Sequence, residues 1–534
     1  MRRLVFLVFV LNALLLALMI PGSASVPWIA AEGLVLAGLF LWLPARSLRL
    51  GLAWGAGVLY GLSALFVLLD SMVRLSLGRS LNLYLDLSIM GASVDLLVAN
   101  LGWMGALLVF VVALALCLIL VALVAGLLLR IGDQARQVPG RHLAVGMAGM
   151  AVTGLILPAQ LVGATVVRIG AVHAGEALEA HQASQHFRER ITAGPMERGS
   201  SPVALGGLTD TTVVLAFVES YGVSALFDER YRPVVQQALA NLESAVQARG
   251  FHVVSGRLRS PVQGGQSWLA HGTLVSGLWI DNQQDYDALL ASRSPTLIND
   301  FQATGHETVA VMPAITMAWP EGRALGYDRI LDADSMDYLG PALNWVTMPD
   351  QYTWSWLHSA ILEPSQVPVF AELSLISSHA PWVPVLPVLE DWRSIGRGEV
   401  FEPWRGAGEA PVSLWKDPER VRAHYARAVA YSINVVAGYI ENRMNQRSLL
   451  VVLGDHQPAP LVTGEDASRD VPVHLISADP ALLEPFAGDG MKPGYGLDGF
   501  SSGIWPGERP GSPMSAFRPF LHRHFQVRDN ISHR

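Results

Sequence analysis

Long apolar runs dominate the first third of the chain and give way to a mixed pattern after about residue 167. Most of these runs reach the roughly 20 residues that a helix needs to cross the hydrocarbon core of a bilayer. The first run resembles a signal peptide, with MRR before it and PGSAS after it, but the later runs favour a multi-span anchor. The pattern predicts five transmembrane helices, over about 4–20, 27–44, 50–69, 104–129 and 143–167.

The charges between the apolar runs predict an orientation. The basic stretches MRR, ARSLR and RIGDQARQVPGRH lie before the first run, between the second and third, and between the fourth and fifth. The positive-inside rule places such loops in the cytoplasm. Five spans from a cytoplasmic start then place the rest of the chain on the outer side of the membrane. The 70–103 segment is either an amphipathic segment at the outer interface or a plain connector.

Beyond the apolar runs the pattern predicts an α/β domain. Short runs without polar alternation, typical of parallel strands buried on both faces, alternate with helix-like stretches. We therefore expect a transmembrane domain over 1–167, a juxtamembrane linker over 168–208 and an external α/β domain with a mostly parallel central sheet over 209–534. The expected strands are 211–218, 307–314, 368–377, 448–455 and 471–477, and the expected helices are 231–249, 284–304 and 417–445.

Polar residues follow three of the expected strands directly. Glu219 follows the first, His379 follows the strand at 368–377, and Asp455 and His456 follow the strand at 448–455. Ligands of such sheets gather at the carboxyl ends of the strands. Carboxylates with imidazole suit Zn²⁺ or Mn²⁺. Each residue taken singly is more often a helix cap or a turn residue, but together they favour a metal site.

The stretch VQGGQSWLAHGTLVSG, residues 262–277, adds a candidate nucleophile. A Gly-rich turn there opens a helix, and Ser267 lies at or near its N-terminus, where free N–H groups favour an anionic ester. A metal can activate such a hydroxyl by coordinating its oxygen. The alternative is that Ser267 serves only as the helix N-cap.

Several motifs resemble the alkaline phosphatase/sulfatase superfamily. SWLAHGTLVSG is similar in spacing to the arylsulfatase signature Cys-x-Pro-Ser-Arg-x-x-Leu-x-Thr-Gly, with Ser267 at the Cys position and His271 at the Arg position. FVES, SSHAPW and GDH look like motifs of lipoteichoic acid synthases and of phosphoglycerol and phosphoethanolamine transferases. GYDRILDADSM, residues 326–336, is similar to a Gly-Phe-Asp segment of that group. The architecture of five N-terminal spans and an external catalytic domain is similar too. It implies a multi-pass protein of a bacterial plasma (inner) membrane, with the catalytic domain in the periplasm or the extracellular space.

The resemblance implies a set of site residues. A divalent cation, Mn²⁺ or Zn²⁺ with Mg²⁺ as a further option, would be held by four of them. Ser267 would be the nucleophile and would be esterified transiently. His379 would contact the substrate phosphate or protonate the leaving group, and His271 would either contact the phosphate or pack against the helix. The implied metal ligands are Glu219, Ser267, Asp455 and His456.

The chain departs from the arylsulfatase signature at positions that bear on the type of ester it would cleave. The nucleophile position holds no Cys, and Leu269 and His271 replace the Pro and the Arg, which argues against a sulfatase. Lipoteichoic acid synthases carry a Thr nucleophile, for which Ser is chemically equivalent. His474 lies in the middle of an expected strand and is predicted to be a core residue, whereas His306 and Trp382 have no assigned role.

Composition adds bounds on the function. A net charge of −8 gives no footprint for nucleic acid, and a single cysteine, Cys117, excludes a disulfide framework and a Cys-based metal site. We expect a membrane-anchored, metal-dependent phosphoester transferase or hydrolase. It would act on a phospholipid or a lipid-linked donor in the same membrane, with water or an envelope glycan as acceptor. The alternatives are a sulfatase or phosphodiesterase of soluble esters, and a non-catalytic receptor or assembly protein with a degenerate enzyme domain.

Overall fold

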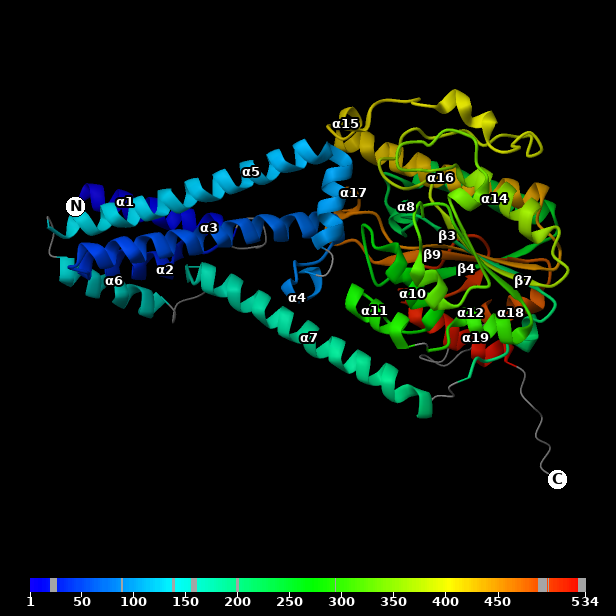
Figure 1. Ribbon diagram of the computed structural model, residues 1–534, viewed down its shortest axis with the longest axis horizontal. Coiled ribbons are helices and arrows are strands. Elements are labelled where there is room, and N and C mark those ends of the chain that lie inside the picture. Colours follow the sequence, from blue (N-terminus) through cyan, green and yellow to red (C-terminus); the bar gives the residue numbers. More distant parts are fainter. Residues whose placement is uncertain are drawn as a thin grey trace. The chain divides into compact units, whose positions relative to one another are not determined.

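A computed structural model of the protein describes most of the chain, as two compact units (Figure 1). One unit comprises Met1–Arg74 and Arg79–Ser184, and the other comprises Leu75–Gly78 and Gln185–Arg534. The predicted domain boundaries at 167 and 208 stay predictions. The described residues are 1–19, 26–87, 90–136, 140–154, 161–197, 201–292, 294–487, 497 and 499–526.

The N-terminal part of the chain is helical apart from one short parallel pair, β1 (Ile29–Ala30) with β2 (Val162–Gly163). Its helices pack around a common apolar core that includes Leu11, Phe40 and Leu128. The helices are α1 (Arg2–Ala17), α2 (Ala31–Trp42), α3 (Arg46–Leu77), α4 (Leu83–Asp86), α5 (Met90–Asp133), α6 (Gly140–Gly154) and α7 (Thr165–Glu197).

The prediction of five membrane spans needs correction. Among the described residues, two helices are long and apolar enough to cross a membrane, Arg46–Leu77 and Leu101–Asp133. The other apolar runs form shorter helices of 16, 12 and 15 residues in α1, α2 and α6. At 1.5 Å per residue, α1 and α2 fall short of a hydrocarbon core of about 30 Å, and so does the described length of α6. The parts of the expected spans at residue 20 and at 155–160 lie outside the described residues.

The 70–103 segment is built of separate helices rather than one amphipathic stretch. It contains the end of α3, the short α4 and the start of α5. Its charges pair locally, since Arg74 Nε lies 2.8 Å from Asp70 Oδ2 and Arg79 Nη2 lies 2.5 Å from Asp86 Oδ1. Its role at an interface stays a prediction.

Small residues allow α3 and α5 to approach closely. A Cβ atom on Gly57 would lie 2.5 Å from the carbonyl oxygen of Val121, whereas one on Gly55 would meet nothing within 4 Å. We therefore expect Gly57→Ala to cost about 1–3 kcal/mol through overpacking, and Gly55→Ala to be neutral or slightly stabilising. Thermal unfolding of the full chain in detergent would measure both. Equal midpoints for the two variants would contradict this contact.

The second unit is built on one twisted sheet. Within the described residues nine strands pair in the order β10-β4-β9-β8-β3-β7-β5-β6, with β11 beside β4. The strands from β8 through β3, β7 and β5 to β6 are parallel, whereas β9 is antiparallel to both β8 and β4. The strands are β3 (Thr212–Val218), β4 (His252–Arg259), β5 (Glu307–Met312), β6 (Arg329–Asp332), β7 (Val369–Leu375), β8 (Ser448–Gly454), β9 (Asp470–Ser477), β10 (Ser501–Ser502) and β11 (Ser512–Pro513).

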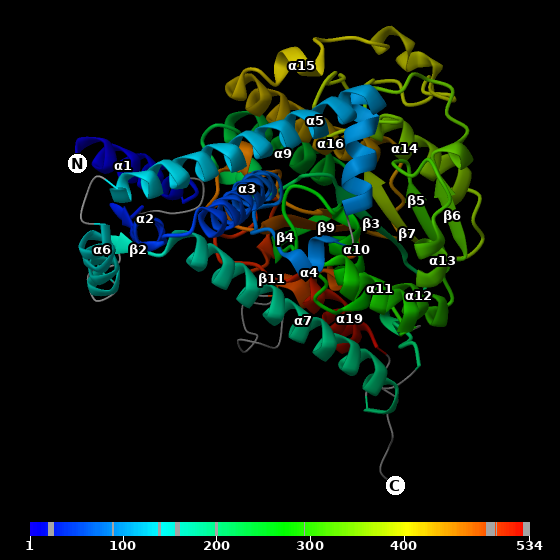
Figure 2. The same ribbon diagram turned by 60° about the vertical axis from the view of Figure 1, so that its left-hand side comes forward.

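Helices cover both faces of this sheet (Figures 1 and 2). Alternate residues of β3 face opposite cores: Val214 and Ala216 join the core with α9 and α16, and Leu215 and Phe217 join the core with α10, α12 and α19. This is the double burial that an uninterrupted apolar strand predicts. The helices are α8 (Ser224–Phe227), α9 (Arg232–Ala248), α10 (Ser267–Ser276), α11 (Gln283–Ser292), α12 (Leu297–Thr304), α13 (Pro320–Leu325), α14 (Asp350–Leu357), α15 (Pro411–Leu414), α16 (Pro418–Asn442), α17 (Pro460–Thr463), α18 (Glu484–Ala487) and α19 (Phe517–Phe525).

The mixed, mostly parallel sheet confirms the α/β class, with two corrections. The strand at 471–477 was expected to be parallel, but β9 runs antiparallel to β8. The connection between them, residues 455–469, contains only the four-residue α17 and no crossover helix of the kind that parallel neighbours need. The expected helix at 284–304 is two helices, α11 and α12, separated around Pro295. The strands β4 and β6 were missed because arginines and serines interrupt their apolar pattern.

A buried ion cluster joins α12 to α19. Asp300 is fully buried and accepts hydrogen bonds from Arg518 Nε at 2.7 Å, from Val203 N–H at 2.9 Å and from His522 Nε2 at 2.7 Å. Burial alone would raise the pKa of Asp300, but the hydrogen bonds of His522 and Arg518 outweigh it and leave the pKa lowered.

The lowered pKa of Asp300 predicts a pH-dependent stability. The contribution of Asp300 is fully present above the usual Asp pKa and is lost as the pH falls through the lower pKa of the folded protein. At pH 7 we expect Asp300→Asn to lower the free energy of unfolding by about 3 kcal/mol, since it breaks a buried pair. The difference between the parent chain and the variant should shrink as the pH falls below the usual Asp pKa of about 4. Denaturant unfolding measures it, and a difference independent of pH would refute the assignment.

Candidate active site

The centre of the sheet brings three strand ends to one level. β3 lies between β7 and β8, and Val218 pairs in register with both Leu375 and Gly454. The residues that follow therefore leave the sheet side by side. Glu219 N–H donates to the carbonyl of Leu375 at 3.0 Å, and Asp455 N–H donates to that of Val218 at 3.4 Å. Register alone thus places Glu219 beside Asp455.

Ser267 reaches the same place from the start of α10. Its Oγ lies 3.3 Å from Glu219 Oε2 and 3.2 Å from His456 Nε2. The N-cap of α10 is Gln266, which has a left-handed φ of 65° after two positive-φ glycines. Ser267 is therefore the first helical residue, and its hydroxyl turns to the strand ends rather than capping the helix. The other hydroxyls of the stretch serve the local fold: Thr273 bonds Ile280, and Ser276 accepts from Leu278 N–H.

The donor set fits a divalent cation. Glu219, Asp455 and His456 each offer one ligand atom, and these atoms all lie within 4.8 Å of one another. His456 Nδ1 bonds the carbonyl of Gln457 at 2.8 Å, so the Nε2 lone pair faces the carboxylates. Nε2 lies 3.5 Å from Glu219 Oε1 and 3.6 Å from Asp455 Oδ2. Electron-pair donors that face one another in this way are stabilised by a cation between them.

The pKa shifts of the two carboxyl groups also favour a bound cation. Burial raises the pKa of Asp455, and the charge of Glu219 raises it further. Burial also acts to raise the pKa of Glu219, but the charges of His456 and His379 outweigh it and leave that pKa lowered. The two carboxylates lie close together away from solvent and repel each other, and a bound cation would offset that repulsion.

Residues that the sequence did not reveal hold the two carboxylates. Ser220 has a left-handed φ of 57°, and its N–H donates to Asp455 Oδ1 at 2.8 Å while its Oγ donates to Glu219 Oε1 at 2.9 Å. The carbonyl of Ser220 accepts from Tyr425 Oη at 3.0 Å. Ser378 Oγ donates to the carbonyl of Glu219 at 2.6 Å. These bonds fix the carboxylates before any ligand binds.

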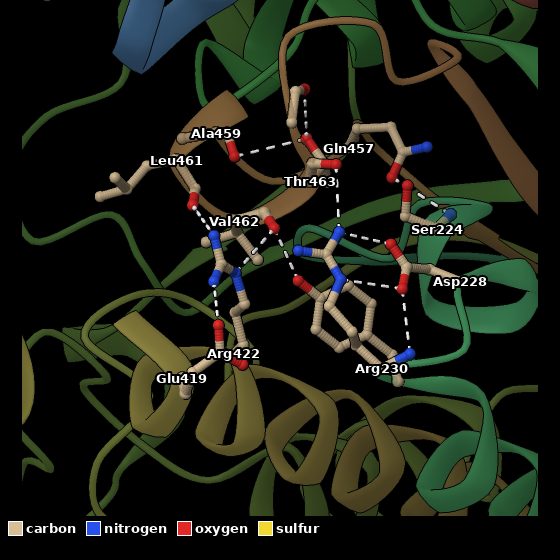
Figure 3. Close-up of polar contacts among 12 residues, drawn as sticks. Ser224, Asp228, Arg230, Glu419, Arg422, Gln457, Ala459, Leu461, Val462 and Thr463 are labelled. Atoms are coloured by element: carbon tan, nitrogen blue, oxygen red, sulfur yellow. Dashed lines mark hydrogen bonds and ion pairs between the residues drawn. The ribbon is translucent and has the colours of Figure 1, made fainter. Parts of the chain in front are cut away.

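The segment after His456 is anchored by two arginines, as Figure 3 shows. Arg230 donates to the carbonyl of Thr463 at 3.3 Å, and Arg422 donates to those of Leu461 and Val462 at 3.2 and 3.4 Å. Gln457 Oε1 accepts from Ser224 N–H at 3.4 Å. The arginines therefore bind backbone rather than face the site, and they tie α17 to the helix layer beneath it.

His271 is one end of a buried chain of hydrogen bonds that continues through Glu372 to Tyr327. Its Nδ1 lies 2.7 Å from Glu372 Oε1, and Tyr327 Oη donates to Glu372 Oε2 at 2.5 Å. The ring stacks on Phe217, with ring centroids 3.7 Å apart. His271 lies one helical turn beyond Ser267, so the two side chains share a face of α10. Burial raises the pKa of Asp455 overall, and the positive charge of His271 acts against that rise.

The other predicted histidines lie in different settings. His379 is exposed, its Nδ1 bonds the carbonyl of Ala380, and its charge acts on Glu219. His306 bonds the carbonyl of Thr211 at the amino ends of the strands, away from the site. His474 is buried in β9 between Tyr221 Oη and Ser255 Oγ, as expected of a core residue. Trp382 is buried and donates from Nε1 to the carbonyl of Ser378.

The structure thus brings together all four predicted ligands, Glu219, Ser267, Asp455 and His456, and sets His379 and His271 near them. Their roles stay predictions. One missed residue carried a signal: Glu372 is a lone acid inside the apolar strand VFAELSL, and such a residue needs a partner. The partners of the other missed residues are set by long-range packing and leave no local pattern.

The fold and the site define an α/β protein with nitrogen and oxygen donors gathered around a serine hydroxyl at the carboxyl ends of parallel strands. No protein-family model matches the sequence, and a search of curated protein sequences finds no match. Its structure is similar to solved structures of the alkaline phosphatase superfamily and its envelope transferases, the group that the motifs resemble.

Three matches illustrate this. The integral membrane lipooligosaccharide phosphoethanolamine transferase A of Neisseria meningitidis is 15% identical, with a TM-score of 0.41, covering 87% of this chain and 88% of that chain. The lipoteichoic acid synthase LtaP of Listeria monocytogenes is 14% identical, with a TM-score of 0.36, covering 54% and 70%. An alkaline phosphatase superfamily protein of Vibrio parahaemolyticus is 14% identical, with a TM-score of 0.35, covering 55% and 69%. At these sequence identities and TM-scores, the matches assign no substrate and no residue role to this chain.

Proposed function

We propose that the chain is a membrane-anchored, metal-dependent phosphoester transferase or hydrolase that works through a covalent intermediate on Ser267. The observation that carries the proposal is the position of Ser267 Oγ, 3.3 Å from Glu219 Oε2 and 3.2 Å from His456 Nε2. A hydroxyl at the start of a helix and beside a ligand cluster is placed both to bind an anionic ester and to attack it.

The residues divide the reaction between them. Ser267 Oγ attacks phosphorus as its proton leaves toward the neighbouring acceptor Glu219 Oε2. The bond between phosphorus and the leaving oxygen breaks, and His379 supplies the proton for that oxygen from the exposed side of the site. In the second half-reaction an acceptor hydroxyl gives its proton to His379 and attacks the phosphorus of the serine ester. The bond between phosphorus and Ser267 Oγ breaks, and Ser267 regains its proton from Glu219. Ser220 and Ser378 hold Glu219 in place throughout.

A divalent cation held by Glu219, Ser267, Asp455 and His456 would stabilise the serine alkoxide and the charge on the phosphoryl oxygens. Two carboxylates, one imidazole and one hydroxyl suit Mn²⁺ or Zn²⁺ better than Mg²⁺, which prefers all-oxygen surroundings. Three protein ligands with one reactive oxygen match the open sites of metal-dependent hydrolases.

The apolar N-terminal helices give a reason to expect a substrate from the membrane. Two helices have the length and composition of membrane spans, so a phospholipid or a lipid-linked phosphoester would share the bilayer with the chain. We propose that the catalytic unit lies outside the plasma membrane, as the basic loops predict. The acceptor is then water or a hydroxyl of an envelope glycan or lipid.

An ester panel tests the proposed function. The purified full chain in detergent would be given nitrophenyl phosphate monoesters, diesters and sulfates, and a phospholipid with a fluorescent headgroup. We expect turnover of phosphoesters that stops with a chelator and returns with Mn²⁺ or Zn²⁺. Turnover of sulfates alone would favour a sulfatase. Failure with every ester at full metal occupancy would favour a non-catalytic receptor.

Glu372 is expected to act as a positioning residue for His271. Its carboxylate holds Nδ1 and so leaves Nε2 as the ring atom available to a substrate oxygen. We expect Glu372→Gln to lower kcat/KM about 10- to 100-fold, as loss of an orienting carboxylate does at other metal sites. Metal content and the melting temperature should change little, and Tyr327→Phe should show a smaller loss in the same direction. A parallel fall in bound metal would instead show a general structural defect.

A further inference from the structure

A cavity in the N-terminal helical unit has the features of a lipid headgroup site. It has a volume of about 470 Å³, within the range of small-molecule pockets. It lies between the start of α1 and the end of α5. Arginines dominate its lining, and no acidic residue lines it. The lining residues are Arg2, Arg3, Phe6, Leu7, Arg130 and Gln134.

These arginines differ from Arg49, Arg74 and Arg79 of the same unit, each of which pairs with an aspartate. Within the described residues, no ion pair or hydrogen bond to a carboxylate is formed by Arg2, Arg3 or Arg130. The nearby Asp133 pairs with Arg49 instead, at 3.5 Å. Three guanidinium groups around one hollow repel one another, and an anion among them would remove that repulsion.

The cavity lies at the basic end of the two candidate spans. The ion pair between Arg49 and Asp133 joins the start of α3 to the end of α5, so both helices present this end to the same side. Arg46 begins α3 there as well. An excess of arginine at one end of apolar helices marks the cytoplasmic side, where the leaflet is rich in anionic lipid.

Apolar surface adjoins the arginines. In α1, Val5, Phe6 and Phe9 are 61%, 65% and 67% exposed. A soluble anion would make no contact with this apolar surface. A phospholipid could place its headgroup phosphate among the arginines and its acyl chains along α1.

From this combination we infer that the cavity binds an anionic phospholipid of the cytoplasmic leaflet. The site is separate from Ser267 and its ligands. The inference rests on the proposed membrane placement but not on the proposed reaction. Each arginine contributes to binding through hydrogen bonds that its guanidinium N–H groups donate to the lipid phosphate, and through its positive charge.

Lipid binding by variants tests this inference. Native mass spectrometry of the full chain in detergent would follow titration with phosphatidylglycerol and with phosphatidylcholine. We expect the parent chain to retain one phosphatidylglycerol in preference to phosphatidylcholine. Arg130→Gln should weaken phosphatidylglycerol about fivefold, and the triple change of Arg2, Arg3 and Arg130 to Gln about 100-fold. Arg130→Lys should keep most of the binding, which separates loss of charge from misfolding.

Arg46→Gln is the matched control, because Arg46 is an exposed arginine at the same end that does not line the cavity. It should change binding less than twofold. Equal losses in Arg46→Gln and Arg130→Gln would overturn the inference, since they would show a diffuse effect of charge. So would displacement of the lipid by equimolar inorganic phosphate, because the cavity would then take the free anion. The readout needs no enzyme activity, so its failure leaves the proposed reaction untouched.

Discussion

Ser267→Ala is expected to lower kcat for phosphoester turnover by at least about 10³-fold, because it removes the hydroxyl that lies between Glu219 and His456 and that we propose attacks the substrate. KM should change little, since the carboxylates and His379 remain. The fold should persist, because Ser267 does not cap α10. Steady-state kinetics with a nitrophenyl phosphoester measures the effect.

Ser276→Ala provides the control on the same helix. Ser276 is buried and serves the end of α10 through its bond to Leu278 N–H. Its loss should lower the melting temperature slightly and leave kcat within a few fold. Survival of full activity in Ser267→Ala, or an equal loss in both variants, would show that another group is the nucleophile.

Asp455→Asn is expected to lower metal affinity by at least about 100-fold and to abolish turnover with it. The substitution keeps the shape of a buried side chain but removes the negative charge at the centre of the ligand cluster. Elemental analysis after dialysis against a chelator, with the metal then restored in steps, measures the affinity. Activity should return only at metal concentrations that also fill the site.

Asp350→Asn is the matched control, since Asp350 is a fully buried carboxyl group outside the cluster. It bonds Ser377 N–H and Ser432 Oγ, and burial raises its pKa. An amide can keep most of those bonds, so metal content should stay at the parent level. Unchanged metal in Asp455→Asn would refute the ligand assignment.

The hydrophobic pattern predicted the core of the α/β unit well, because buried parallel strands leave a local signal. All five expected strands exist, within a few residues of their predicted bounds. Strand direction left no such signal: β9 is as fully buried as β8, yet it runs the other way because no crossover helix separates the two strands. The apolar N-terminal runs predicted too many membrane spans for a related reason, because apolar content does not reveal where a helix ends. The run at 27–44 contains the two-residue strand β1 and only 12 helical residues.

The candidate site was predictable where chemistry follows a strand directly. Glu219, Asp455 and His456 stand one or two residues past β3 and β8, and neighbouring parallel strands bring them together. Ser267 needed the resemblance, since a Gly-rich turn alone does not say where its helix will point. The supporting bonds of Ser220 and Glu372 depend on tertiary contacts between residues 45 to 235 positions apart, and no local pattern encodes them.

The central claim is that Ser267 carries the substrate's phosphoryl group during turnover. Rapid quenching of the full chain with a chromogenic phosphoester, followed by peptide mass spectrometry, tests this claim directly. The account predicts one phosphoester adduct on Ser267 that forms within the first turnover and decays at the rate of turnover. An adduct on another hydroxyl, or turnover at full rate with no adduct on any residue, would contradict it.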